Sequence, residues 1–163
     1  MVAHIPIEII QLDQESYHLF VRCFIQGKAY SLVIDTGASK TVFAFNILKD
    51  RVENLKQNEN EMQSAGISAQ IGESFQGTLR DFKLGALELP SFEVVLIDLT
   101  YVNEVYSKIM DKTISGLIGS DFLLKYKACI DYQKEELTLK FKKHKSKGQV
   151  LDNHSVPGYV ACL

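Results

Sequence analysis

The feature that most constrains the fold of this chain is residues 33–39, with the sequence Val-Ile-Asp-Thr-Gly-Ala-Ser. The apolar run 32–34 predicts the end of a buried strand, because short apolar runs bounded by turn residues are typical of such strands. Asp35 follows directly and enters a turn, where Gly37 permits a close approach that a Cβ would forbid. The pattern predicts a carboxylate held on a tight turn at a strand end, with the Ser39 hydroxyl within reach.

A second glycine-containing element lies far downstream, at residues 114–123. There Ile118 and the apolar residue before it precede Gly119, and residues 120–126 have the pattern of a short helix. Together the two elements resemble the aspartic protease superfamily, in which an apolar-apolar-Gly segment threads beside the aspartate loop. The resemblance covers about residues 17–141. It is closest to the retroviral-type proteases and their bacterial single-domain relatives, which carry one such pair of elements per chain.

The resemblance implies a mostly β, single-domain fold, a closed β-barrel of the acid protease (retropepsin-like) type with one or two short helices. We assign residues 1–141 to this domain. Residues 142–163 form a lysine-rich C-terminal tail, whose apolar end is either part of a dimer interface or disordered.

The residue pattern also places individual elements. Aromatic and β-branched residues at 17–25, followed by a turn and the apolar run 29–34, predict a hairpin that ends at Asp35. The apolar spacing over 44–55 predicts an amphipathic helix. Residues 100–113 are less regular and predict a loop with a helical turn.

A glycine-bearing hairpin is predicted between residues 62 and 84. In the family, a hairpin at this place folds over the substrate as a flap, and such a lid excludes water and completes the site. The resemblance puts the tip near residues 67–72, with Ile67, Ser68 and Gly72 as flap residues. A plain surface hairpin explains the same glycines.

The chemistry implied by the resemblance is peptide hydrolysis by two aspartates that share one proton and hold a water between them. Two like charges that close cannot both ionise, so one carboxyl stays protonated. The ionised carboxylate takes a proton from the water while its protonated partner polarises the scissile carbonyl. The chain contains no second Asp-Thr-Gly or Asp-Ser-Gly. The pair therefore requires a homodimer, with Asp35 of each chain on the twofold axis.

The resemblance assigns supporting roles to residues around the catalytic carboxylate. Thr36 reaches across to the partner's backbone, and Gly37 lets the two loops approach each other. Ser39 holds the outer carboxylate oxygen. Ile118 and Gly119 supply the segment beside the loop.

The chain lacks one ion pair that is typical of the retroviral proteases. In retroviral proteases the downstream glycine is followed by an arginine, which pairs with an acid just after the aspartate loop. Here Ser120 and Lys40 occupy these places. This ion pair is absent, so we expect a dimer interface different from the viral one.

The composition of the chain indicates which binding partners, cofactors and cellular compartment to expect. The net charge of −2 is too small to imply a polyanionic partner, and the five lysines in residues 140–147 predict a solvated tail. We expect a peptide or protein substrate, with neither nucleic acid nor membrane as a partner. The cysteines (Cys23, Cys129 and Cys162) and the four histidines lack metal-ligand spacing, so no metal or other cofactor is expected. No secretory signal is visible, which predicts a cytoplasmic protein.

Two other functions are compatible with the same sequence. A non-catalytic domain of this fold would serve for dimerisation or would bind an extended peptide by strand addition. A monomer would use the fold only as a scaffold. The combination of Asp35, Thr36, Gly37 and Ser39 favours the peptidase, since a binding domain needs no paired carboxylates. The oligomeric state separates the monomeric scaffold from the other two.

Overall fold

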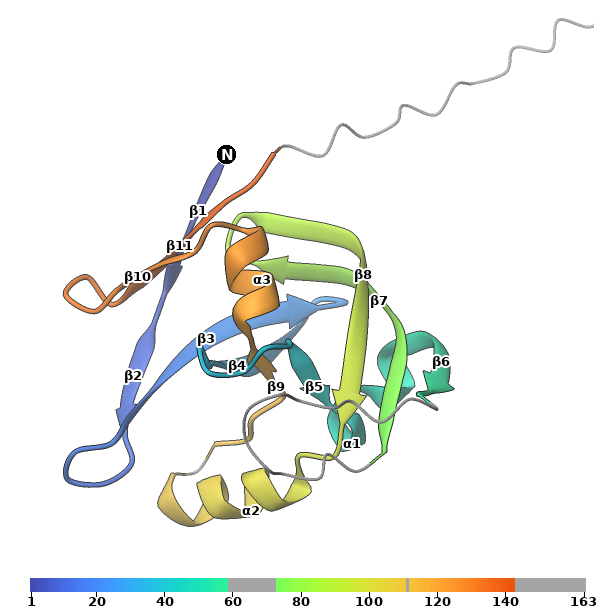
Figure 1. Ribbon diagram of the computed structural model, residues 1–163, viewed down its shortest axis with the longest axis horizontal. Coiled ribbons are helices and arrows are strands. Elements are labelled where there is room, and N and C mark those ends of the chain that lie inside the picture. The colour runs from blue at the N-terminus through green and yellow to red at the C-terminus, as the bar shows by residue number, and fades with distance from the viewer. Residues whose placement is uncertain (59–72, 111, 143–163) are drawn as a thin grey trace, which may run out of the picture.

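The computed structural model describes residues 1–58, 73–110 and 112–142, which form a mostly β domain. Eight strands form one sheet in the order β2-β3-β4-β9-β5-β8-β7-β6, and β3 also pairs with β7. That additional pairing closes a six-stranded ring, so the predicted closed β-barrel is confirmed (Figure 1). The strands of the ring are β3 (Tyr17–Ile25), β4 (Lys28–Ile34), β9 (Gly116–Ile118), β5 (Val42–Ala44), β8 (Leu87–Ile97) and β7 (Ser74–Leu84).

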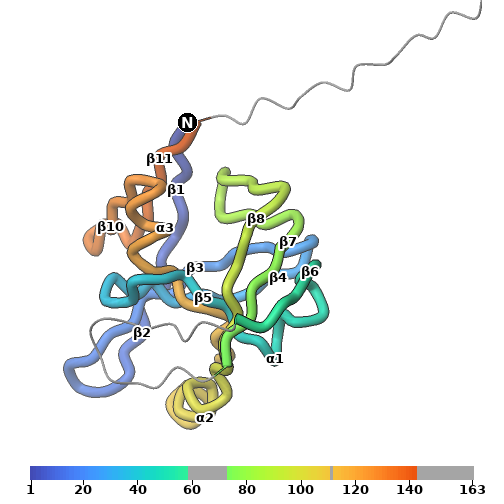
Figure 2. Tube along the Cα trace, turned by 45° about the vertical axis from the view of Figure 1, so that its right-hand side comes forward, coloured from blue at the N-terminus to red at the C-terminus, as the bar shows by residue number. Residues whose placement is uncertain are grey.

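The remaining strands extend or flank the barrel. Strand β2 (Glu8–Gln11) lies beside β3, and β6 (Val52–Gln57) lies beside β7. A separate antiparallel sheet has the order β1 (Val2–Pro6), β11 (Glu136–Lys140) and β10 (Cys129–Asp131). Figure 2 shows β1 and β11 side by side at one end of the domain. This sheet ties the start of the chain to residue 141, whose carbonyl accepts a hydrogen bond of 2.7 Å from the amino group of Met1.

The hairpin of β3 and β4 separates two apolar clusters. Alternate residues along a strand point to opposite faces, and here Val21, Cys23 and Leu32 face the barrel interior. Phe20 and Val33 face the other way and form a second cluster with Tyr106 and Ile114. The hairpin matches the predicted one closely, because its alternation and its turn at residues 26–27 are both visible in the sequence.

The predicted helix over 44–55 is wrong in its second half. Helix α1 (Phe45–Leu48) and the 3₁₀ helix η1 (Lys49–Arg51) give way to strand β6, which pairs with β7. Gly77 on β7 makes this pairing possible, since a Cβ there would lie 2.3 Å from Val52 Cγ1. Backbone pairing with a distant strand therefore overrides the helical spacing of the apolar residues.

The predicted loop over 100–113 is also wrong, because residues 100–109 form helix α2 (Thr100–Ile109). Asp98 accepts a hydrogen bond of 2.8 Å from the backbone N–H of Thr100 and so satisfies a free donor of the first turn. Many residues of this segment have only modest helix propensity, so the sequence alone did not predict the helix. Its stability comes from the packing of Val102 and Tyr106 on the second apolar cluster.

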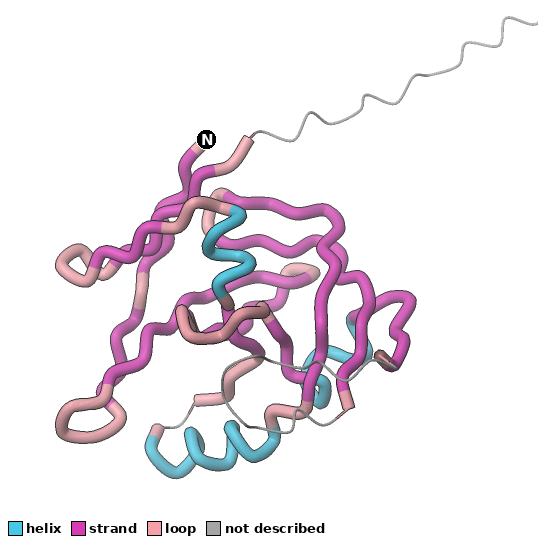
Figure 3. Tube along the Cα trace, in the orientation of Figure 1, coloured by secondary structure: helices cyan, strands magenta, loops and turns pink. Residues whose placement is uncertain are grey.

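With α3 (Ser120–Lys125), the described part of the chain contains three α-helices, more than the one or two expected. Figure 3 shows that strands make up most of the domain. None of the helices in the described ranges has the length and apolar character needed to cross a membrane.

The burial of Cys23 predicts a difference in thiol reactivity. Cys23 is fully buried, and burial raises the pKa of its thiol to about 12, whereas Cys129 is exposed. Because the thiolate is the reactive species, we expect a disulfide reagent at about pH 8 to label Cys129 rapidly and Cys23 only through unfolding. Peptide mass mapping of a Cys162→Ser variant measures both rates. Fast labelling of Cys23 in the folded protein would contradict the packing of β3.

Candidate active site

The aspartate loop begins where β4 ends, and β9 lies beside it. Strand β9 pairs in parallel with β4, with Ile118 opposite Ile34, and antiparallel with β5. It therefore lies between the strands that enter and leave the loop. The backbone N–H of Asp35 donates a 3.0 Å hydrogen bond to the carbonyl of Ile118. The structure thus brings together two segments that are more than 80 residues apart, as the sequence motifs predicted.

The carboxylate of Asp35 is held through one of its oxygens. Oδ1 accepts hydrogen bonds from the backbone N–H groups of Gly37, at 2.9 Å, and Ala38, at 3.1 Å. Oδ2 receives no hydrogen bond from any residue that the structure describes. Asp35 is half-buried, while Thr36, Gly37 and Ser39 are exposed. The loop thus fixes the direction of the carboxylate and leaves its second oxygen available.

The predicted contact from Ser39 to the carboxylate is not seen in the single chain. Within the described ranges the Ser39 hydroxyl makes no hydrogen bond to Asp35. The carbonyl of Thr36 accepts a 2.9 Å hydrogen bond from the hydroxyl of Ser120 in α3, while the Thr36 hydroxyl has no partner among the described residues. Within one chain, the loop is therefore stabilised by its own backbone N–H groups and by the hydrogen bond from Ser120 of α3.

Gly119 is required by close packing rather than by an unusual backbone angle. A Cβ on Gly119 would lie 2.5 Å from the carbonyl carbon of Lys40 and 2.9 Å from the carbonyl oxygen of Ala38. The next residue, Ser120, donates its backbone N–H to that same Ala38 oxygen at 2.8 Å. The start of α3 therefore lies directly against the aspartate loop. A Cβ on Gly37, by contrast, would meet only Asp35 Oδ1, at 3.3 Å.

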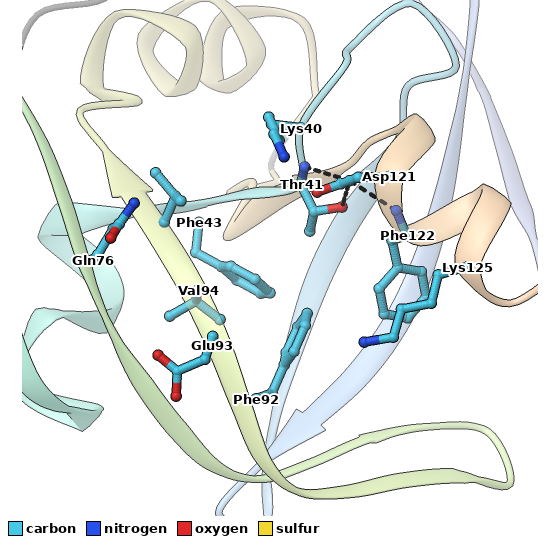
Figure 4. Close-up of a pocket in the computed structure, with 11 residues that line it drawn as sticks. Lys40, Thr41, Phe43, Gln76, Phe92, Glu93, Val94, Asp121, Phe122 and Lys125 are labelled. Carbon is cyan, nitrogen blue, oxygen red and sulfur yellow. Dashed lines mark hydrogen bonds between the residues drawn. The ribbon is translucent and has the colours of Figure 1, made fainter. Parts of the chain in front are cut away.

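A network centred on Thr41 and Asp121 was not identified from the sequence. Asp121 Oδ1 accepts hydrogen bonds from the backbone N–H of Thr41 at 2.8 Å and from its hydroxyl at 2.7 Å (Figure 4). The hydroxyl of Thr41 in turn accepts a 3.0 Å bond from the buried N–H of Gly119. This network braces the loop against α3 within one chain, where the viral arginine–acid brace is absent. An acid in the first turn after Gly119 is the signal that could have revealed it, since carboxylates are favoured there.

A phenol and an imidazole also lie near the aspartate loop. The hydroxyl of Tyr106 on α2 forms a hydrogen bond with Nδ1 of His18, and its ring meets Phe20 edge-on. His18 and Asp35 lie at the same end of the hairpin, because the last pair of its ladder joins Leu19 to Ile34. Burial, and then the charge of Asp35, raise the pKa of Tyr106, so the phenol stays neutral. This group was missed because α2 was expected to be a loop.

Some predicted features cannot be placed in this site. The flap residues Ile67, Ser68 and Gly72 lie outside the described residues, as does all of the C-terminal tail except Lys142. Within the described ranges, no group of three or more His, Cys, Asp or Glu side chains is arranged to hold a metal ion.

The family model for aspartyl proteases matches residues 21–122. This span is well over half of the chain and contains Asp35, Thr41, Gly119 and Asp121. The chain belongs to the aspartyl protease family. The match runs from within β3 to within α3, so the aspartate loop and the start of α3 both lie inside the family region. Together with the closed barrel, it confirms the acid protease fold predicted from the sequence.

Two solved structures are similar to this chain. One is a retropepsin-like aspartic protease from Rickettsia conorii, with 16% identity, a TM-score of 0.46, and coverage of 85% of this chain and 91% of that chain. The other is the retroviral protease-like domain of Ddi1 from Leishmania major, with 17% identity, a TM-score of 0.46, and coverage of 75% and 87%. No curated protein sequence matches this chain.

Proposed function

We propose that this chain is an aspartic endopeptidase that hydrolyses peptide bonds as a homodimer, with one Asp35 from each chain. The observation that carries the proposal is the state of the Asp35 carboxylate. One oxygen is fixed by the N–H groups of Gly37 and Ala38, and the other has no described partner. The loop is exposed on the side of Thr36 and Gly37, where a second copy can approach.

Three other carboxylates of the described ranges form hydrogen bonds that stabilise local structure. Asp98 accepts hydrogen bonds from Thr100 at the start of α2, and Asp131 accepts them from the backbone of its own turn. Asp121 accepts from Thr41 and from the N–H of Phe122. None of these three carboxylates is hydrogen-bonded to Asp35, which is consistent with a second carboxylate that comes from another chain.

In the proposed mechanism the two Asp35 carboxyls share one proton. Two neighbouring negative charges repel each other, which opposes ionisation of both carboxyls at once. The pair therefore titrates as a unit. The ionised carboxylate removes a proton from the water held between them, and the oxygen of that water attacks the scissile carbonyl. The protonated carboxyl donates its proton to the carbonyl oxygen, and collapse of the intermediate delivers a proton to the leaving amine.

The proposal predicts that activity follows dimerisation. On dilution, specific activity should fall along the same curve as the dimer fraction, because a monomer holds half of the site. Sedimentation velocity gives the dimer fraction, and cleavage of a mixed peptide library from acid to neutral pH gives the activity. Excess Asp35→Asn protein added to a dilute wild-type sample should lower its activity. Each heterodimer would then carry only one Asp35 in the shared site.

Two outcomes would count against the proposed homodimeric peptidase. Undiminished cleavage by a protein that stays monomeric at every concentration would contradict the shared site. A folded dimer that cleaves no peptide in the library would support the non-catalytic peptide-binding alternative.

A further inference from the structure

A groove runs between β8 and α3, from the aspartate loop to the end of β11. It consists of two adjoining pockets of about 540 Å³ and 470 Å³, which share Phe92, Glu93 and Lys125 in their walls. The first pocket reaches Lys40, directly after the aspartate loop, and the second reaches Lys142. Asp35 lines neither pocket, so the groove is separate from the catalytic carboxylate.

The floor of the groove is a packed row of aromatic rings. Figure 4 shows Phe43, Phe92 and Phe122 between β8 and α3. The ring centroids lie 6.1 Å apart for Phe43 and Phe92, 5.9 Å apart for Phe92 and Phe122, and 4.6 Å apart for Phe122 and Tyr126. Phe43, Phe122 and Tyr126 are buried. Phe92 is partly exposed, so it is the ring of this row that a ligand can reach, and the buried rings support it from below.

One wall of the groove is a strand edge without a partner. Strand β8 pairs with β7 along its length, but it pairs with β5 only at residues 95–97. Residues 91–94 line the groove and have no strand on their second side among the described residues. An unpaired edge presents backbone N–H and C=O groups to which an extended chain can add as a further strand.

The charges around the groove favour an anionic ligand. Its walls carry Lys40, Lys125, Lys140 and Lys142, and none of these forms an ion pair with a described residue. The two acids of the walls are already hydrogen-bonded, Asp121 to Thr41 and Glu93 to the Thr78 hydroxyl at 2.8 Å. Four lysines against two occupied carboxylates leave a net charge of +2 at the walls.

We propose that this groove binds an extended, acidic segment of a partner polypeptide. The segment adds to the edge of β8 at residues 91–94, packs an apolar side chain against Phe92, and pairs its carboxylates with the groove lysines. The chain's own tail is a poor occupant, because it brings three further lysines within residues 143–147. The site goes beyond the proposed peptidase activity, since it does not include Asp35.

The test uses a fluorescein-labelled twelve-residue peptide of alternating glutamate and valine, and the Asp35→Asn protein, so that binding is measured whether or not the chain cleaves. We expect saturable binding by fluorescence anisotropy that weakens as salt is added, because exposed charges are screened. The same peptide with glutamine in place of glutamate should bind at least about tenfold more weakly. Hydrogen exchange should slow at the amides of residues 91–94 when the acidic peptide is bound.

Two triple variants that remove equal charge test whether the peptide binds in the groove. Changing Lys40, Lys125 and Lys140 together to Gln should weaken binding by about tenfold. The control changes Lys28, Lys56 and Lys108 to Gln, which removes the same charge from exposed positions outside the groove. Equal losses in the two triple variants, or no protection at residues 91–94, would overturn the proposal. Binding that appears only after deletion of residues 143–163 would assign the groove to the tail instead.

Discussion

Replacing Asp35 with Asn is expected to abolish peptide hydrolysis while leaving the barrel folded. Positioned proton transfer contributes roughly 10²–10⁴-fold to rate, and in a homodimer the substitution removes both proton-transferring groups at once. The Asn Oδ1 can still accept the hydrogen bonds from Gly37 and Ala38, so the loop keeps its support. The measurement is cleavage of a mixed peptide library by the wild type and the variant, from acid to neutral pH.

The control for this prediction is the folded state of the variant. The urea midpoint and the dimer dissociation constant should stay close to those of the wild type. Loss of cleavage with both values retained assigns the chemistry to the carboxylate. Cleavage by Asp35→Asn at the wild-type rate would falsify the assignment of Asp35.

Replacing Gly119 with Ala is expected to cause a large loss of stability. The new Cβ would lie 2.5 Å and 2.6 Å from the carbonyl carbon and oxygen of Lys40. Both are backbone atoms, so α3 or the aspartate loop must move. Overpacking of this kind typically costs about 1–3 kcal/mol, occasionally more. Displacement of the loop should also reduce cleavage, because Asp35 is held through the same segment.

The matched comparison is Gly37→Ala, which adds the same methyl to the aspartate loop itself. Within one chain that methyl meets only Asp35 Oδ1, at 3.3 Å. Urea denaturation should therefore show a clearly smaller loss in the free energy of unfolding than for Gly119→Ala. A wild-type urea midpoint for Gly119→Ala would show that α3 does not pack against the loop as described.

The elements predicted correctly from the sequence are those that short, continuous sequence patterns mark. Strands β3 and β4 are marked by alternation and a turn, and the aspartate loop is marked by an apolar run that ends at Asp35. Helix α3 follows a glycine and carries an acid in its first turn. Each of these patterns reflects which side chains a single strand or helix buries, so neighbouring residues are enough to predict it.

The errors fall where distant segments decide the outcome. Residues 52–57 are a strand because β7 offers an edge and Gly77 leaves room for Val52. Residues 100–109 are a helix because the outer face of β3 and β4 supplies an apolar surface for Tyr106. Packing against such surfaces outweighs intrinsic propensity, and propensity is all that the segment itself shows.

The sequence by itself determined the aspartate loop and the hairpin that leads into it, because strand alternation and turn chemistry act over a few residues. The barrel class and the glycine element beside the loop followed from the resemblance of these residues to the aspartic protease superfamily. Only the tertiary structure decided how that loop is braced, through Thr41, Gly119 and Asp121. It also decided that α2 lies beside the loop and that an aromatic groove opens next to β8. These features depend on contacts between residues up to about 80 positions apart, and no local pattern specifies which distant groups will meet.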